Sequence, residues 1–93
     1  VGAQRAQLVG LVQHVGADEA ALDAKVAERV EQLLLAAPGA QAAAKRLIRR
    51  VAGEEKTAVR GYTANLIAQR RASEEGREGM SAFLEKRPPR WQE

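Results

Sequence analysis

The 93-residue sequence contains no cysteine, a single histidine and only three aromatic residues. Without cysteine the chain forms no disulfide framework, and it offers no thiolate nucleophile or cysteine-ligated zinc site. A disulfide-dense secreted domain is thereby excluded, and we expect a cytoplasmic protein. No apolar run approaches the roughly 20 residues that a membrane-spanning helix needs, so no membrane partner is expected.

Hydrophobic residues make up 45% of the chain, but many of them are alanine, which contributes little transfer energy on burial. A chain of this length builds only a thin core. We therefore expect help from a partner surface, through oligomerisation or a further domain. The sequence begins at Val1, directly in helix-like residues, which suggests a truncated or processed product.

The spacing of apolar residues predicts an all-α fold of about four to five helices with one short strand-like piece. Asp18 and Ser73 are expected to be N-caps, and Pro38 is expected in the first turn of a helix. The helices are predicted near residues 2–9, 18–37, 38–53, 57–71 and 73–87, and the strand-like piece at 11–15.

Each of the four longer predicted helices carries one apolar face, which is typical of helices that bury one side. The glycines at 76 and 79 are interpreted as sites of close packing within the last helix. The expected inward residues are Leu22, Val26, Val30, Leu33 and Leu34; Ala40, Ala44, Leu47, Ile48 and Val51; Val59, Tyr62, Leu66 and Ile67; and Gly76, Met80, Phe83 and Leu84.

Charge is distributed unevenly along the chain, whose net charge is +3. Residues 1–44 carry three basic and five acidic residues, and the remainder carries twelve basic and seven acidic residues. The cluster Lys45-Arg46-x-x-Arg49-Arg50 has no aromatic platform and no DNA-reading motif beside it. We interpret it as a solvated helix face and expect no nucleic-acid partner. A phosphate-bearing ligand, a neighbouring subunit or nucleic acid remain alternatives, and salt-sensitive DNA binding would favour the last.

Catalytic and metal-binding patterns are missing from the sequence. His14 has no second ligand at metal-binding spacing. The pairs Glu54-Glu55 and Glu74-Glu75 are adjacent in sequence, so their side chains point to different sides of a helix and are interpreted as helix-end charges. No glycine-rich phosphate loop is present. The sequence therefore predicts no catalytic residue and no metal site in this chain.

Phe83 and Lys86 form the candidate binding pair. A helix would place residues three apart on one face, offering an apolar ring beside a point charge, which suits an adenine ring next to a phosphate. The alternative is that Phe83 belongs to the core and Lys86 is a solvated cation at the helix end.

Several segments in order carry a family resemblance. Residues 6–12 (AQLVGLV), with Val15, resemble the AxxxGLVxxV segment of the enoyl-CoA hydratase/isomerase (crotonase) family. The Ala-Pro at 37–38 and the Ala-Lys at 44–45 match the helix that follows in that family. The stretch from Ser73 through the proline pair resembles its terminal pattern SxDxxEGxxAFxEKRxP. The chain departs from the family in three places: Glu75 replaces aspartate, Trp91 replaces phenylalanine, and residues 16–17 lack the usual proline turn.

The resemblance implies that residues 1–17 end the core region and that residues 18–93 form the helical C-terminal domain. Family members hydrate or isomerise the double bond of an enoyl-CoA thioester, with an oxyanion hole and glutamates that belong to the region upstream of this segment. Their C-terminal helices pack subunits into trimers or hexamers and cover the coenzyme A site. The resemblance assigns Phe83 and Lys86 to the adenine and phosphate end of coenzyme A. A free-standing helical self-association or interaction module is the alternative.

Overall fold

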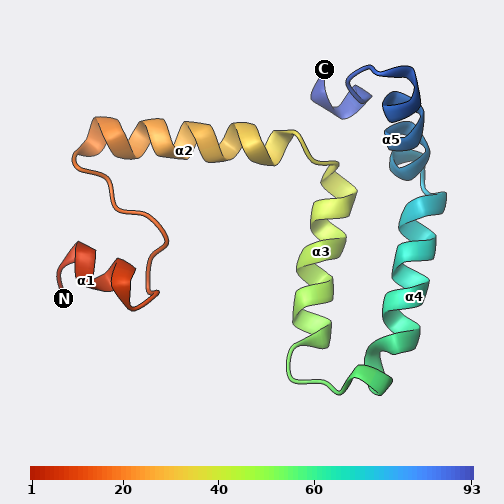
Figure 1. Cartoon of the computed structure of the whole chain (residues 1–93), viewed down its shortest axis with the longest axis horizontal. Helices are drawn as coiled ribbons and strands as arrows, with labels where there is room; N and C mark the ends of the chain where they lie inside the picture. Colours follow the sequence, from red (N-terminus) through yellow and green to blue (C-terminus); the bar gives the residue numbers. More distant parts are fainter. The chain divides into compact units, whose positions relative to one another are not determined.

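The computed structural model describes all of residues 1–93 and contains helices but no strand. This confirms the predicted all-α fold (Figure 1). The helices are α1 (Ala3–Leu8), α2 (Glu19–Leu34), α3 (Pro38–Val51), α4 (Lys56–Ala72) and α5 (Glu74–Glu85), followed by the 3₁₀ turn η1 (Arg90–Gln92).

The strand-like piece expected at 11–15 is not a strand. Those residues form bends and irregular backbone after Gly10, which has a φ of 84°. The Leu11 N–H donates to the Ala6 carbonyl at 2.9 Å and turns the chain back over the end of α1. A strand requires a neighbouring strand for its backbone hydrogen bonds, and the chain contains no second one.

The chain divides into two compact units, residues 1–33 and 34–93. In the first unit, the Ala21 N–H donates to the Asp18 carboxylate at 2.8 Å, which confirms the predicted N-cap of α2. The apolar face predicted for α2 is largely exposed and borders an open groove with Val12 and His14. The boundary between the end of the core region (residues 1–17) and the helical C-terminal domain (residues 18–93) stays a prediction.

The second unit is built on α3 and α4, which run antiparallel side by side, and α5 contacts the C-terminal end of α4 (Figure 1). Pro38 is the first residue of α3, as predicted. Ala43 is buried on α3, and the half-buried residues Leu47 and Val51 follow it at four-residue spacing. From α4, Val59 and Leu66 are also half-buried, so this part of the predicted apolar pattern is confirmed.

Other residues predicted to face inward are exposed, and for them the prediction is wrong within this chain. The only buried apolar side chains are Ala37, Ala43 and Ala82. A periodic pattern identifies the apolar side of a helix, but it does not say whether the chain itself covers that side. The exposed members on α3, α4 and α5 are Ala40, Ala44, Ile48, Ile67, Met80, Phe83 and Leu84.

The sharp junction between α4 and α5 depends on Ser73 and Gly76. The Gly76 N–H donates to the Ser73 hydroxyl oxygen at 3.1 Å, which confirms the predicted N-cap. A side chain at position 76 would overlap the Arg70 carbonyl oxygen, so only glycine fits there. No helix of the chain combines the length and the apolar character needed to cross a membrane.

Candidate functional site

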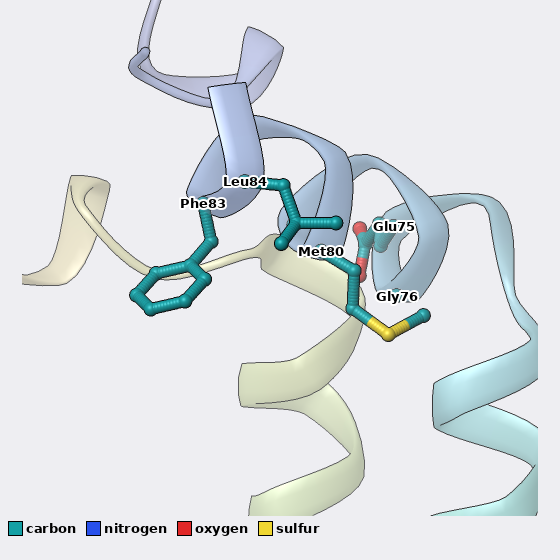
Figure 2. A pocket seen from close by; sticks show the side chains of 6 residues that line it. Glu75, Gly76, Met80, Phe83 and Leu84 are labelled. Atoms are coloured by element: carbon teal, nitrogen blue, oxygen red, sulfur yellow. The ribbon is translucent and has the colours of Figure 1, made fainter. Parts of the chain in front are cut away.

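Phe83 lies on the last turn of α5, and 83% of its surface is exposed. Figure 2 shows its ring standing away from the helix. The alternative that Phe83 is a core residue is therefore wrong for this chain. An exposed ring of this size presents an apolar plate, and an aromatic face of this kind stacks on a nucleobase.

Lys86 lies immediately after α5, where it is the helix C-cap. It is the only non-glycine residue with a positive φ, at 56°, in the left-handed region. This conformation costs a residue with a side chain about 1–2 kcal/mol. The direction of the Lys86 side chain is thus set by the cap and not by helical spacing from Phe83. Its ammonium group is exposed and forms no hydrogen bond or ion pair with the chain.

A shallow groove of about 440 Å³ runs along α5 beside Phe83 (Figure 2). Met80 and Leu84 form its apolar lining, with Gly76, Gly79 and Glu75 along the backbone side. Met80 also lines a neighbouring hollow with Ala40 of α3 and Ile67 of α4. The two hollows therefore make one apolar surface across α3, α4 and α5, which we call the apolar face (Ala40, Ile67, Met80, Phe83 and Leu84).

Glu78 is the only buried charged residue of the chain, with 8% of its surface exposed. Its carboxylate accepts hydrogen bonds from the Arg87 guanidinium at 2.6 and 3.3 Å. It also accepts from the backbone N–H and the Nε of Arg90, both at 3.0 Å. These bonds, led by that from Arg87, lower the pKa of Glu78 from 4.5 to about 2. The same ion pair raises the pKa of Arg87.

The C-terminal residues after Arg90 contact the start of the second unit. Trp91 Nε1 and Gln92 Nε2 donate to the same Leu35 carbonyl oxygen, at 3.0 and 2.8 Å. A Cβ atom on Gly79 would lie 3.2 Å from the Trp91 ring, so the tail packs closely on α5. This confirms the close-packing interpretation of Gly79. The tail is fixed at both ends, by Glu78 and by Leu35.

Glu75 joins two other helix ends. Its carboxylate accepts from the Gly39 N–H at 2.9 Å and from Arg70 Nη2 at 2.6 Å. Gly39 lies in the first turn of α3, where free N–H groups favour a negative charge. The interpretation of Glu75 as a helix-end charge is thus confirmed. Its carboxylate lies at the N-terminus of α3 as well as in the first turn of its own helix, α5.

The other candidate residues from the sequence, the basic cluster of α3 and the possible metal ligands, do not form a site. Lys45 and its basic neighbours on α3 are exposed, in agreement with a solvated face, and Arg50 lies 5.4 Å from the centre of the Tyr62 ring. No group of three or more His, Asp or Glu residues is arranged to hold a metal ion. Sequence reasoning missed the Glu78 cluster. The only available signal was that Glu78 and Arg87 both fall in the terminal motif of residues 73–88.

Comparison with known proteins agrees with this architecture. The sequence profile of the enoyl-CoA hydratase/isomerase family matches residues 1–93. The crystal structure of an enoyl-CoA hydratase/isomerase from Marinobacter aquaeolei superimposes on the whole chain with a TM-score of 0.94 and 33% sequence identity. No curated protein sequence matches the chain.

A second solved structure is similar. It is described as an enoyl CoA hydratase/isomerase (crotonase) from Legionella pneumophila, with a TM-score of 0.83 and 40% identity over 98% of this chain. The chain spans only 35% of the length of each solved protein.

Proposed function

The chain belongs to the enoyl-CoA hydratase/isomerase family, and on this premise we propose that it is the helical, non-catalytic part of an enzyme that hydrates or isomerises an enoyl-CoA thioester. In this role it covers the coenzyme A portion of the substrate and packs against neighbouring subunits. The acyl group and the reaction itself lie with the parts of the family fold outside these 93 residues.

Coenzyme A binding is proposed at Phe83 and Lys86, and the exposed Phe83 ring is the observation that carries it. A ring exposed at a helix end is costly to leave in water, because it forgoes roughly 1.5–3 kcal/mol of burial energy. Stacking on adenine recovers part of this. The unpaired Lys86 ammonium supplies a point charge for a phosphate group within three residues of the ring.

Subunit packing is proposed for the apolar face. Ile67 is 68% exposed and Leu84 79% exposed, and both belong to a continuous surface over three helices. Contiguous apolar surfaces of this kind mark association sites in soluble proteins. Assembly into a trimer or hexamer would remove such a surface from water.

Glu75 and Glu78, the two half-buried or buried glutamates of the second unit, support a non-catalytic role. A general acid at neutral pH needs a raised pKa, whereas that of Glu78 is about 2. The Glu75 carboxylate is already engaged by Gly39 and Arg70. Neither side chain is free to move a substrate proton.

The binding proposal is tested by titrating coenzyme A into the chain and measuring the dissociation constant by calorimetry. We expect Lys86→Ala to weaken binding about tenfold, since one charge-assisted phosphate contact is worth roughly 1.4 kcal/mol. Lys45→Ala, which removes an exposed lysine from α3, is the matched control and should bind as the unchanged chain does. Equal affinities for the two lysine variants would contradict the proposal.

A self-association module without a coenzyme A role is the second candidate, favoured by the extent of the apolar face alone. Light scattering of the chain and of Ile67→Lys separates association from binding. We expect a discrete oligomer for the unchanged chain and a smaller species for Ile67→Lys. An oligomer combined with no coenzyme A affinity would favour the second candidate, and a concentration-independent monomer would contradict subunit packing by this chain.

A further inference from the structure

The left-handed conformation of Lys86 is held from the residues that follow it. The Arg87 N–H donates to the Ala82 carbonyl at 3.0 Å, which closes the end of α5 across Lys86. This bond alone favours glycine at position 86, because glycine takes the left-handed conformation without a steric cost. A lysine there is retained only if further contacts fix the chain on both sides.

Glu78 supplies those contacts from two turns earlier on α5. Arg87, the residue after Lys86, places its guanidinium on the buried Glu78 carboxylate, and Arg90 binds the same carboxylate through its backbone and side chain. Glu85, the residue before Lys86, pairs with Arg87 Nε at 2.8 Å. The residues on both sides of Lys86 are thus held by ion pairs, while its own side chain is unpaired.

We propose that Glu78 is a positioning residue that acts through Arg87 to hold Lys86 in the left-handed conformation, with its ammonium group directed to a phosphate of coenzyme A. This inference rests on the proposed function and adds a residue that does not itself touch the ligand. The cluster is built like a positioning device, because the acceptor is buried and the residue it controls is exposed.

A double-mutant cycle on the 93-residue chain tests it, with coenzyme A as the probe. Lys86→Ala, Glu78→Gln and the double variant are compared by calorimetry, and circular dichroism establishes that each is as helical as the unchanged chain. We expect Glu78→Gln to weaken binding about three- to tenfold. If Glu78 acts only through Lys86, the double variant binds no more weakly than Lys86→Ala alone.

Glu74→Gln is the matched control, because Glu74 lies on the same helix, carries the same charge and has no partner. It should leave the affinity unchanged. Should Glu78→Gln fail to fold, Arg87→Gln replaces it, since this change breaks the link beside Lys86 and leaves Arg90 on Glu78. We expect the same non-additive loss for that variant. In parallel, the NOE between the amide and α protons of residue 86, which is strong in the left-handed conformation because the two protons lie close together, should weaken in Glu78→Gln.

The outcomes separate this inference from the function on which it rests. Additive losses, or a Glu78→Gln variant that binds as the unchanged chain does, would overturn the positioning role while the Lys86 contact stands. An NOE of unaltered strength at residue 86 would overturn it as well. A Lys86→Ala variant with full affinity would overturn the proposed coenzyme A site, and the positioning role with it.

Discussion

The carboxylate of Glu78 and the guanidinium of Arg87 lie 2.6 Å apart, although the two residues are nine positions apart in sequence and Arg87 lies beyond the end of α5. Contact between them requires the chain to reverse directly after the helix. The left-handed Lys86 provides this reversal. The pair therefore depends on the conformation of the whole C-terminal tail, in which Arg90 also binds Glu78 and Trp91 binds the Leu35 carbonyl.

The first prediction is that Glu78 stabilises the fold less at acidic pH. The pKa of Glu78 is about 2 in the folded chain, against 4.5 for the unperturbed group, so the folded state favours the ionised carboxylate. Its stabilising contribution is complete above pH 4.5 and is lost as the pH falls toward 2. We expect the difference in unfolding free energy between the unchanged chain and Glu78→Gln to shrink over this range. Urea unfolding at pH 7, 4, 3 and 2 measures it, and a difference that does not vary with pH would contradict the assigned pKa.

The second prediction compares two helical glycines. A Cβ atom at Gly61 meets nothing within 4 Å, whereas one at Gly39 would lie 2.6 Å from a Glu75 oxygen and 2.8 Å from Arg70 Nη2. Gly61→Ala should stabilise the chain by roughly 1 kcal/mol through helix propensity. Gly39→Ala gains the same propensity but displaces the Glu75 carboxylate, so it should be about 1 kcal/mol less stable than Gly61→Ala. Thermal unfolding of both variants would reveal the gap, and equal stabilities would show that the Glu75 contact contributes nothing.

The third prediction addresses the tail. Trp91→Phe removes the hydrogen bond to Leu35 and shortens the ring, whose atom nearest to Gly79 is Cη2 at the far end of the indole. Because Gln92 still donates to that carbonyl, we expect a modest loss of about 0.5–1 kcal/mol in unfolding free energy. Circular dichroism in urea is the suitable measurement, since the variant has no tryptophan left to report fluorescence. A variant as stable as the unchanged chain would mean that the Trp91 hydrogen bond adds nothing to the one that Gln92 makes with the same carbonyl.

The fourth prediction uses the two N-caps. Ser73→Ala removes the acceptor for the Gly76 N–H and should destabilise α5 by about 1 kcal/mol. Asp18→Ala removes the cap of α2 to a similar extent, but in the other compact unit. Hydrogen exchange followed by NMR should show faster exchange in α5 for the first variant and in α2 for the second. Faster exchange throughout the chain in either variant would contradict a local capping role.

The sequence by itself determined the all-α class, an approximate number of helices and several of their boundaries. Pro38, Asp18 and Ser73 mark helix starts because a missing N–H or a short polar side chain acts on the adjacent turn only. The expected exposure of the basic cluster at Lys45 followed from the same local reasoning. The family was also legible in the spacing of the terminal motif.

Only the tertiary structure decided which apolar faces are covered and which charges meet. Ala43 is buried while Ile67 and Phe83 are exposed, because burial depends on what lies opposite a helix and not on its own period. The Glu78 cluster was out of reach for the same reason, since a salt bridge across a chain reversal depends on the conformation of one residue, Lys86. Local chemistry is written within a few positions of the sequence, whereas packing joins positions that only the folded chain brings together.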